Sequence, residues 1–373
     1  MLVTFRLATL DIGGTERVFL SVADFLSTTY GWQINFVIDR IKGNETEKVA
    51  ISKGYKVVGL GVNRSWKAIV PFTDYLKQNK PDLVFSAYTE TNAAAILSNA
   101  LNRFRTPLIA TEHSSLDEAW RDKSALRKLM REIMVRYIYR FADHVLCVSR
   151  GLTEQISKRL NHAHIGYIYN PTRFARRSRS RDEARVELGI AQNTRMILAV
   201  GRICKQKNYL MMIEAFSKLN RTDNYHLYIV GGIFEPEEKV LVDQMIERYG
   251  IGEYIHFVGF TNEVHAYYEA ADLLVLSSAW EGFGNVLVEA MAFGLPVVST
   301  RCNYGPAEIL ADGQFGILVD VDDSTAMQNG IQHIFEQNGF AAATQMQRAE
   351  TFSESRVGEE YYHLVQSTIG RKS

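Results

Sequence analysis

The sequence predicts an α/β protein built from two doubly wound parallel sheets. Short apolar runs alternate with amphipathic segments of helical length along nearly the whole chain, a pattern typical of open parallel sheets. The chain has 373 residues, which is too long for one ordinary domain and suits two of roughly 170–190 residues each. The alternation breaks near Tyr169-Asn170-Pro171 and then restarts. We therefore expect two domains with a ligand cleft at the carboxyl ends of their strands.

The first half of the chain supplies one series of alternating elements. Its strand candidates are short apolar runs, and its helix candidates repeat apolar residues at the helical period. The expected strands are Leu2–Thr9, Gln33–Ile38, Lys56–Leu60, Leu83–Ser86, Pro107–Thr111 and His144–Val148. The expected helices are Glu16–Thr28, Trp66–Gln78, Thr91–Leu101, Ser124–Phe141 and Gly151–Leu160.

The second half repeats this pattern after an intervening segment. Arg173–Arg185 is rich in arginine and nearly free of large apolar residues, so it is expected to be a linker. The expected strands that follow are Met196–Gly201, His226–Val230, Ile255–Val258, Leu273–Ser277, Pro296–Ser299 and Gly316–Val319. The expected helices are Tyr209–Leu219, Glu237–Tyr249, Val264–Ala270, Val286–Phe293, Ser324–Phe335 and a last one at Glu354–Ile369.

Composition and charge narrow the class of protein. Apolar residues make up 46% and charged residues 23%, with a net charge of zero, so no overall attraction to nucleic acid is expected. Cys147, Cys204 and Cys302 have no paired spacing, which argues against a disulfide framework or a zinc site. The segment Met1–Gly14 does not resemble a signal peptide, and no apolar run reaches the ~18 residues of a membrane-spanning helix.

The run from Glu281 to Glu289 is the most informative stretch. It places two carboxylates eight residues apart, with glycines and an amide side chain between them. Glu281 is expected in a glycine loop, and Glu289 about a turn and a half into the helix that follows. A loop that opens a helix presents backbone N–H groups and a positive dipole end to a ligand. This arrangement suits a ligand with phosphates and hydroxyls, such as a nucleotide sugar.

The loop from Gly201 to Asn208 follows the first strand of the second half and precedes a helix. Arg202 and Lys207 can therefore reach the cleft from a strand end, and two fixed cations beside a helix start suit a diphosphate. The alternative is a solvated basic loop. The position of this loop, at a strand end equivalent to that of Glu281, favours the functional interpretation.

Two strand ends in the first half carry further candidates. Gly13-Gly14 permits close approach of the backbone to a ligand, although the dinucleotide pattern G-x-G-x-x-G is absent and a simple tight turn is the alternative. His113 follows a strand and is expected to point into the same cleft, with a structural histidine as the alternative. The Asp-x-Asp at Asp320–Asp322 is interpreted as part of a helix cap, too far along the chain to share the Glu281 loop, and no metal site is expected.

The segment 121–140 is strongly basic. It holds seven basic residues against two acidic ones, Asp122 and Glu132, a net of +5. The basic residues are Arg121, Lys123, Arg127, Lys128, Arg131, Arg136 and Arg140. An apolar stripe at helical spacing consists of Leu126, Leu129, Met130, Ile133, Tyr137, Ile138 and Phe141. Either the stripe faces the core and the charges are solvated, or this surface meets anionic lipid or a lipid-linked diphosphate. The concentrated charge favours the second interpretation.

The Glu281–Glu289 run with its helix resembles the E-x(7)-E signature of retaining glycosyltransferases of family 4, which have the GT-B fold of two Rossmann-like domains. The other matching features, in chain order, are Gly13-Gly14, His113 after Thr111-Glu112, Gly201-Arg202 with Lys207, and Gly259. The resemblance covers essentially the whole chain. The Gly-Gly-Thr-Glu-Arg start and the basic segment after His113 look most like bacterial enzymes that extend polyprenyl-diphosphate-linked glycans.

The resemblance implies roles for individual residues. Arg202 and Lys207 would hold the donor diphosphate, aided by Gly284 and the amides of Asn285, Val286 and Leu287. Glu289 would bind the ribose hydroxyls, Glu281 the hydroxyls of the transferred sugar, and the backbone of Phe260-Thr261 the base. His113 would line the reaction centre, the Gly13-Gly14 loop would approach the diphosphate, and Arg127, Lys128 and Arg131 would meet the lipid diphosphate.

The resemblance also implies a domain layout. The first domain would comprise 1–170 plus the final helix 354–369, which crosses back onto it. Residues 171–190 would be a linker, and 191–353 the domain that binds the nucleotide sugar.

The expected activity is transfer of a hexose or N-acetylhexosamine from a UDP-linked sugar to a lipid-linked saccharide in bacterial surface-glycan synthesis. No metal or other cofactor is expected, because two cations and a helix N-terminus can neutralise the departing diphosphate. The resemblance implies retention by front-side attack. The expected location is the cytoplasmic face of the membrane, with peripheral contact to anionic lipid and no nucleic-acid partner.

Two alternatives to this activity remain. The first is a nucleotide-sugar epimerase with the same fold, which needs a further acid or base near the anomeric carbon. The second is a non-catalytic partner subunit, against which the presence of Glu281, Arg202 and Lys207 argues.

Overall fold

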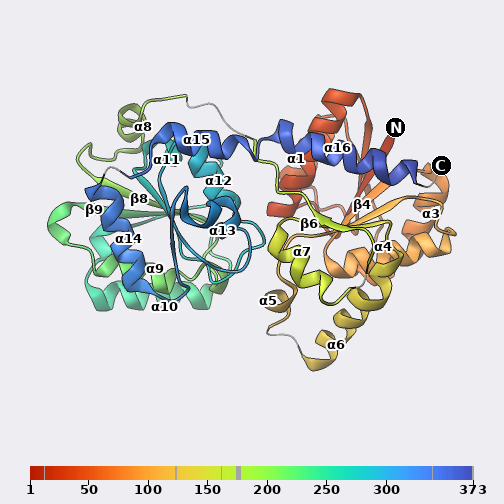
Figure 1. The fold of residues 1–373 in the computed structure, drawn as a ribbon, viewed down its shortest axis with the longest axis horizontal. Coiled ribbons are helices and arrows are strands. Elements are labelled where there is room, and N and C mark those ends of the chain that lie inside the picture. The colour runs from red at the N-terminus through yellow and green to blue at the C-terminus, as the bar shows by residue number, and fades with distance from the viewer. Residues whose placement is uncertain (12, 122–123, 161, 174–177, 338, 372–373) are drawn as a thin grey trace. The chain divides into compact units, whose positions relative to one another are not determined.

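The chain forms two compact α/β units (Figure 1). A computed structural model describes residues 1–11, 13–121, 124–160, 162–173, 178–337 and 339–371. Unit 1 comprises Met1–Arg173 and Ser353–Ser373, and unit 2 comprises Phe174–Phe352. Unit 1 is thus built from both ends of the chain.

Unit 1 contains a seven-stranded parallel sheet in the order β3-β2-β1-β4-β5-β6-β7. The strand order reverses between β1 and β4, which makes a topological switch point at the carboxyl ends of these strands. The strands are β1 (Leu2–Leu7), β2 (Gln33–Ile38), β3 (Lys56–Gly59), β4 (Leu83–Ala87), β5 (Leu108–Glu112), β6 (His144–Cys147) and β7 (Ile165–Tyr167).

The helices of unit 1 connect these parallel strands. The α-helices are α1 (Gly14–Tyr30), α2 (Glu45–Ser52), α3 (Ile69–Asn79), α4 (Thr89–Leu101), α5 (Leu116–Trp120), α6 (Ala125–Ile133), α7 (Arg150–Ser157) and α16 (Glu354–Gly370). The 3-10 helices are η1 (Ser65–Ala68) and η3 (Tyr139–Phe141), and η2 (Met134–Ile138) is a π-helical turn.

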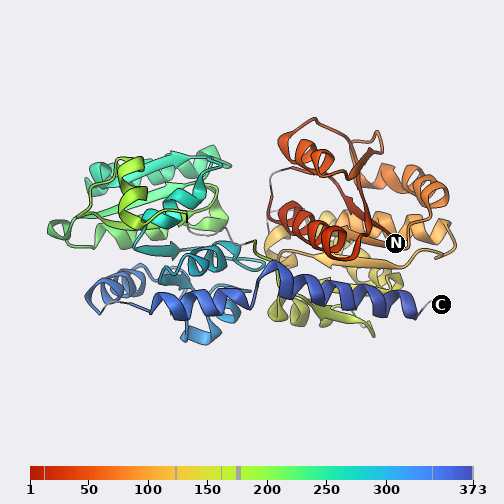
Figure 2. The same cartoon turned by 90° about the horizontal axis from the view of Figure 1, so that it is seen from above.

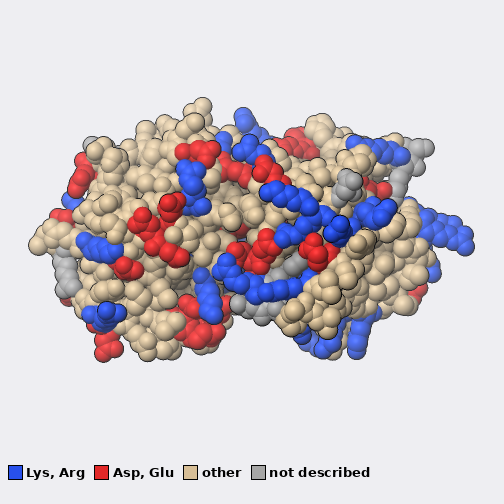
Figure 3. Space-filling model, turned by 60° about the horizontal axis from the view of Figure 1, so that its bottom comes forward, with Lys and Arg blue, Asp and Glu red and all other residues tan. Residues whose placement is uncertain are grey.

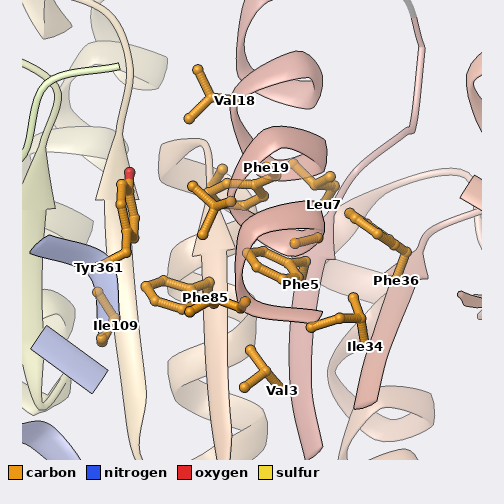
Figure 4. Packing of buried hydrophobic residues seen from close by; sticks show 14 of the residues in the cluster. Val3, Phe5, Leu7, Val18, Phe19, Ile34, Phe36, Phe85, Ile109 and Tyr361 are labelled. Carbon is orange, nitrogen blue, oxygen red and sulfur yellow. The ribbon is translucent and has the colours of Figure 1, made fainter. Parts of the chain in front are cut away.

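The core of unit 1 is an aromatic stack on the central strands (Figure 4). The Phe5 ring lies 5.3 Å from the rings of both Phe36 and Phe85, because β1 pairs with β2 and β4 at these positions. Phe19 of α1 covers Phe5 at 4.9 Å, and Tyr361 of α16 lies 5.8 Å from Phe85. Residues from both ends of the chain therefore share one core.

Helix α16 packs beside α1 (Figure 2). Tyr30 Oη donates to Glu359 Oε2 at 2.8 Å, and a Cβ on Gly358 would lie 2.3 Å from the Phe25 ring. The glycine is needed for this close approach between the helices. The last helix thus belongs to unit 1.

Unit 2 contains a six-stranded parallel sheet in the order β10-β9-β8-β11-β12-β13. Its strands are β8 (Arg195–Val200), β9 (Tyr225–Val230), β10 (Ile255–Gly259), β11 (Leu273–Leu276), β12 (Val297–Thr300) and β13 (Ile317–Val319). Its α-helices are α8 (Arg181–Leu188), α9 (Tyr209–Ser217), α10 (Pro236–Tyr249), α11 (Val264–Ala270), α12 (Asn285–Ala292), α13 (Pro306–Ile309), α14 (Ser324–Glu336) and α15 (Ala342–Glu350). Four 3-10 turns complete the unit: η4 (Lys205–Lys207), η5 (Arg221–Asp223), η6 (Gly252–Tyr254) and η7 (Ala311–Gly313).

The prediction of two doubly wound parallel sheets is confirmed. The predicted strands match the observed ones to within one or two residues, because each is a short apolar run with a clear boundary. The elements α2, α5, β7, α13 and α15 were not predicted. All are short, and the longest of them, α15, has nine residues.

The predicted linker 171–190 is wrong over part of its length. Residues 174–177 lie outside the described ranges, but Arg181–Leu188 forms α8, which opens with a capping box between Ser180 and Glu183. Arg185 on this helix is fully buried. Its guanidinium donates to Ala270 O at 2.9 Å and to Asp272 Oδ2 at 2.7 Å. The arginines that suggested a solvated segment instead attach α8 to unit 2.

Three further observations bear on the class of protein. Among the described helices, none is long and apolar enough to cross a membrane. The described ranges hold no group of three or more His, Cys, Asp or Glu side chains that could bind a metal ion. Cys147, Cys204 and Cys302 are buried free thiols.

Candidate active site

The loop after β8 brings Lys207 to the carboxyl end of the unit 2 sheet. Gly201 directly follows the strand, η4 carries Lys207, and Asn208 then caps α9 by accepting from the Met211 amide. A Cβ on Gly201 would lie 2.8 Å from Lys207 Cε. Glycine at this position therefore lets the lysine side chain cross the strand end.

Lys207 pairs with Glu281 at this edge. Lys207 Nζ donates to Glu281 Oε1 at 2.6 Å, and the two side chains are only 16% and 9% exposed. Ser278 Oγ donates to the same oxygen at 2.7 Å. Among the described residues, the other oxygen, Oε2, has only a long contact of 3.5 Å from Gln206 Nε2. One carboxylate oxygen is thus held inside the protein, and the other retains capacity to accept hydrogen bonds.

The loop after Glu281 turns directly into α12. Gly284 is the N-cap with φ of 104°, a left-handed conformation that glycine adopts without strain. The Leu287 amide donates to Gly284 O at 2.9 Å, and the Leu287 side chain is buried. This internal bond argues against the predicted role of that amide in binding a diphosphate. Asn285 and Val286 are half-buried at the helix start.

Glu289 lies further along α12 and has a different partner. Tyr268 Oη of α11 donates to Glu289 Oε2 at 2.7 Å, and the Tyr268 ring stacks on Phe293 at 5.5 Å. Glu281 and Glu289 therefore belong to separate hydrogen-bond groups. This separation fits two hydroxyl-binding carboxylates better than an acid/base pair.

Arg202 follows β8, and Phe260 and Thr261 follow β10, with β9 between these two strands in the sheet. The exposed Arg202 guanidinium lies over the Phe234 ring, 4.4 Å from its centroid. The Gly231 amide donates to Gly259 O at 2.8 Å, which joins the ends of β9 and β10 just before Phe260. Phe260 is 57% exposed, and Thr261 Oγ1 accepts from the Glu263 amide at 3.0 Å.

Asp323, the residue after the Asp-x-Asp, performs the capping role predicted for this segment, and Asp322 contacts the loop that carries Lys207. Asp323 caps α14 by accepting from the Ala326 amide at 2.8 Å. Asp322 Oδ1 accepts from Asn208 Nδ2 at 2.8 Å, so it contacts the residue next to Lys207. Its position far along the chain concealed this contact, because α14 packs against α9.

His113 stands just beyond the end of β5 in unit 1. Thr111 Oγ1 donates to Ser86 O at 2.8 Å and therefore accepts from His113 Nε2–H at 2.9 Å. This arrangement leaves Nδ1 as a bare acceptor, and it is buried without a hydrogen bond among the described residues. Burial lowers the pKa of His113 to about 3. The imidazole is therefore neutral at physiological pH.

Glu112 forms a second cluster beside His113 that sequence analysis missed. The Tyr139 hydroxyl donates to Glu112 Oε1, and Asn92 Nδ2 donates to the same oxygen at 3.3 Å and to Tyr139 Oη at 2.9 Å. Burial raises the pKa of Glu112 to about 7, although these hydrogen bonds act in the opposite direction. A polar residue in the otherwise apolar strand β5 was the available sequence signal.

The Gly13-Gly14 turn opens α1, with Gly13 as the N-cap; residue 12 lies outside the described ranges. A Cβ on Gly13 would lie 2.2 Å from Glu16 Oε2. Glu16 is buried and accepts from Tyr88 Oη at 2.9 Å. The glycine therefore makes room for a buried carboxylate, a role that the sequence interpretation did not include.

The basic segment of unit 1 contains both paired and exposed cations. Asp122 and Lys123 lie outside the described ranges. Arg131 pairs with Glu90, with 2.9 Å between Nη2 and Oε1, and Lys128 Nζ donates to Arg121 O at 2.7 Å. Arg127 is exposed.

The predicted apolar stripe does not face the core. Met134, Val135 and Tyr139 are buried instead, because the π-helical turn η2 shifts the helical phase. Ile138 alone of the stripe is half-buried, and its other members are exposed.

Sequence analysis missed several partners of the predicted residues. Ser278 and Gln206 bind Glu281, Tyr268 binds Glu289, and Phe234 lies under Arg202. Gln206 adjoins Lys207 in sequence, and Ser278 follows strand β11, so both had a local signal. Tyr268 and Phe234 had none, because their positions depend on packing.

Comparison with known proteins extends these observations to the family. The Glycosyltransferase Family 4 profile matches residues 12–176, and the profile of Glycosyl transferases group 1 matches residues 180–351. One relative is a Campylobacter jejuni alpha-1,4-N-acetyl-D-galactosaminyltransferase, named for an acceptor carried on diphospho-undecaprenol. It is 24% identical over 379 residues, covering 98% of each chain. Another relative, the D-inositol 3-phosphate glycosyltransferase of Corynebacterium glutamicum, is 26% identical over 97% of this chain and 94% of its own.

Solved structures share the fold across the whole length. Anabaena HepE in complex with UDP superimposes with a TM-score of 0.83 at 19% identity, over 98% of this chain and 100% of its own. Sucrose-phosphate synthase from Thermosynechococcus elongatus superimposes with a TM-score of 0.83 at 18% identity, over 100% of both chains. The chain is thus a GT-B glycosyltransferase, in which residues 12–176 belong to glycosyltransferase family 4 and residues 180–351 belong to the group 1 glycosyl transferases.

Proposed function

We propose that this chain transfers a hexose or N-acetylhexosamine from a UDP-linked sugar to a lipid-linked saccharide, with retention of anomeric configuration. The observation that carries the donor half is the Lys207–Glu281 pair, with 2.6 Å between Nζ and Oε1, at the carboxyl ends of β8 and β11. It places a cation and a hydroxyl acceptor side by side at the start of a helix. The UDP bound in the HepE structure supports the choice of nucleotide.

Lys207 and Arg202 are proposed to hold the donor diphosphate. A lysine ammonium has three N–H donors. Glu281 takes up one of these donors, so two remain for phosphate oxygens. Arg202 is exposed over Phe234, and this stacking holds a planar guanidinium suited to two phosphate contacts. Because these cations neutralise the leaving group, we propose a reaction without a metal ion.

The two carboxylates are proposed to bind hydroxyls. Within the described part of the chain, Glu281 Oε2 has only the long contact with Gln206, so it can accept a hydrogen bond from a hydroxyl of the transferred sugar. Glu289 is half-buried and oriented by Tyr268, which suits the ribose hydroxyls. Backbone near Phe260 and Thr261 would hold the base.

His113 is proposed to line the reaction centre near the transferred sugar. Its Nε2–H is used by Thr111, and its Nδ1 is buried and does not reach a ligand. A neutral imidazole with a low pKa does not supply a proton to the leaving group. This geometry supports front-side attack, in which the departing phosphate assists the acceptor hydroxyl.

The acceptor is proposed to be a saccharide on a polyprenyl diphosphate in bacterial glycan synthesis. Two Campylobacter relatives are named for acceptors on diphospho-undecaprenol. Arg127 and Lys128 are exposed and can contact the lipid diphosphate, whereas Arg131 is already paired with Glu90. Such an acceptor places the enzyme at the cytoplasmic face of the membrane.

A screen of nucleotide sugars tests this function. Each UDP-sugar is incubated with and without a polyprenyl-diphosphate saccharide, in buffer containing EDTA. We expect UDP to be released only when the acceptor is present. NMR of the product should show the same anomeric configuration, axial or equatorial, as in the donor sugar. An epimer formed from UDP-sugar alone would indicate the epimerase. UDP binding without turnover on any acceptor would indicate a non-catalytic subunit. Inversion, or a requirement for a divalent ion, would contradict the proposed mechanism.

A further inference from the structure

Unit 1 carries a row of exposed apolar side chains along α6, η2 and η3, here called the apolar ridge. Its exposed fractions are far above those expected of core residues. The members are Leu126 (68%), Leu129 (57%), Met130 (46%), Ile133 (45%), Tyr137 (53%) and Phe141 (53%). Phe104, 39% exposed, extends the ridge because its ring stacks on Phe141 at 6.0 Å. Soluble proteins rarely leave so many large apolar side chains together in water.

The ridge cannot be buried by a simple rotation of its helix. The opposite face packs Met134 and Val135 into unit 1, where they are 4% and 0% exposed. Tyr139 on the same face donates its hydroxyl to the buried Glu112. Turning the ridge inward would pull these residues out of the core. The exposure of the ridge is therefore built into the packing of the helix.

The ridge is flanked by exposed positive charge. Arg127, Lys128, Arg136 and Arg140 are all exposed. Three acidic residues nearby, within the described ranges, are already paired: Glu132 with Arg159 at 3.4 Å, Glu90 with Arg131 at 2.9 Å, and Glu118 with Arg121 at 2.7 Å. Figure 3 turns the lower side of unit 1 forward and shows lysine and arginine side chains around a broad uncharged surface.

We propose that the apolar ridge inserts into the headgroup–acyl boundary of an anionic bilayer. An apolar strip bordered by arginine and lysine, with aromatic rings at one end, matches what an interfacial helix presents to lipid. The charges draw the surface to anionic headgroups, and the apolar side chains then contribute binding that salt does not screen. This inference deepens the proposed function, because it states how an enzyme for a lipid-linked acceptor would be held at the membrane.

Vesicle flotation with matched variants tests the ridge. The test pair is Leu129→Ser with Ile133→Ser, and the control pair is Ile51→Ser with Val70→Ser. The control residues are 57% and 64% exposed in the same unit, away from the ridge. We expect the wild type to float with phosphatidylglycerol-containing vesicles and to bind pure phosphatidylcholine at least tenfold more weakly. The ridge pair should weaken binding to the anionic vesicles at least tenfold, and the control pair less than twofold.

A fluorescence measurement separates insertion from charge alone. Leu129→Trp should be quenched by lipids brominated on the acyl chain, whereas Ile51→Trp should not. Equal binding by both serine pairs, or no quenching of Leu129→Trp, would overturn the proposal. Conversion of a dimer to a monomer by the ridge pair, with unchanged vesicle binding, would assign the ridge to a second copy of the chain and also overturn it.

The outcome is independent of the transferase assay. The vesicles contain no acceptor or donor, and transfer to a short-chain acceptor in detergent reports on the active site alone. Loss of vesicle binding with full activity in detergent is the result expected of the ridge pair. Failure of every donor in the assay would remove the proposed function and leave the vesicle result unchanged.

Discussion

The two units differ in the charge of the polar side chains at their strand ends. In unit 2, Lys207 and Glu281 form a charged pair with little exposure, supported by Ser278. In unit 1, Glu112 and His113 adjoin each other without a salt-bridge partner among the described residues. Burial raises the pKa of Glu112 and lowers the pKa of His113, so both shifts favour the neutral side chain. Charge is therefore kept where a diphosphate is proposed to bind, and suppressed where a sugar is proposed to lie.

This difference has a physical reason. A buried charge persists only when a partner compensates the loss of water, as Lys207 and Glu281 do for each other. Without such a partner the group takes up or releases a proton instead. The Tyr139 and Asn92 hydrogen bonds orient Glu112 but are too weak to keep it fully ionised. Unit 1 thus offers neutral hydrogen-bonding groups, and unit 2 offers fixed charge.

The largest effect is expected from removing the cation of unit 2. Lys207→Ala should lower kcat/KM by roughly 10²–10³-fold, the usual cost of losing one charge-stabilising group. Arg202→Ala should have a similar effect if it shares the diphosphate. Lys205→Ala is the matched control, since Lys205 is an exposed lysine two residues away in the same turn. Steady-state kinetics at saturating acceptor measures these rates, and near-normal rates in both variants would remove the proposed diphosphate site.

The second prediction concerns the pH dependence of stability in unit 1. Folding raises the pKa of Glu112 from 4.5 to about 7. The contribution of Glu112 to the free energy of unfolding is therefore fully present below pH 4.5 and is lost as pH rises toward 7. The pKa of His113 is lowered to about 3, so its contribution is present above 6.5 and is lost as pH falls toward 3. Between pH 4.5 and 6.5 the two groups change the free energy of unfolding in opposite directions as pH rises. Glu112 alone changes it by about 1.4 kcal/mol per pH unit in this range.

Thermal unfolding from pH 4 to 8 measures this balance. Relative to the wild type, Glu112→Gln should gain stability as pH rises through this window, and His113→Asn should lose it. The control is Glu45→Gln, an exposed glutamate of α2. Parallel curves for the wild type and both variants would show that neither group is neutralised by folding.

A smaller effect is expected from Tyr139→Phe. The substitution removes the hydroxyl that donates to Glu112, and the Asn92 amide still donates to that carboxyl. Loss of a buried hydrogen bond of this kind costs about 1–3 kcal/mol of unfolding free energy. Tyr137→Phe is the matched control, because Tyr137 is 53% exposed on the other side of the same helix. Denaturant unfolding compares the two, and equal midpoints would mean that the hydroxyl contributes nothing.

The smallest effect is expected from Glu289→Gln. A neutral amide still accepts a hydroxyl hydrogen bond, so the KM for the donor should rise about tenfold, or about 1.4 kcal/mol, with kcat nearly unchanged. Tyr268→Phe should raise it less, because the carboxylate remains and only its orientation is relaxed. A fall in kcat without a change in KM would place Glu289 in the chemical step rather than in donor binding.

The sequence by itself determined the class of fold and the strand ends that matter. Apolar period and length are local properties, so β2, predicted as Gln33–Ile38, was obtained with its observed bounds. The cation of Lys207 and the carboxylates of Glu281 and Glu289 were found in the same way, because each follows a predicted strand or opens a predicted helix. The roles of these residues were expectations from family resemblance, and they stay predictions.

Only the tertiary structure decided which polar groups meet. Lys207 pairs with Glu281 across 74 positions, and Arg185 with Asp272 across 87. The sequence around a residue does not indicate partners so far along the chain. Arg185 was therefore expected in a linker, although it is buried in unit 2. One π-helical turn likewise changed which side of residues 125–141 faces the core. Composition predicted the charge of that segment, but packing decided that its apolar ridge points into solvent.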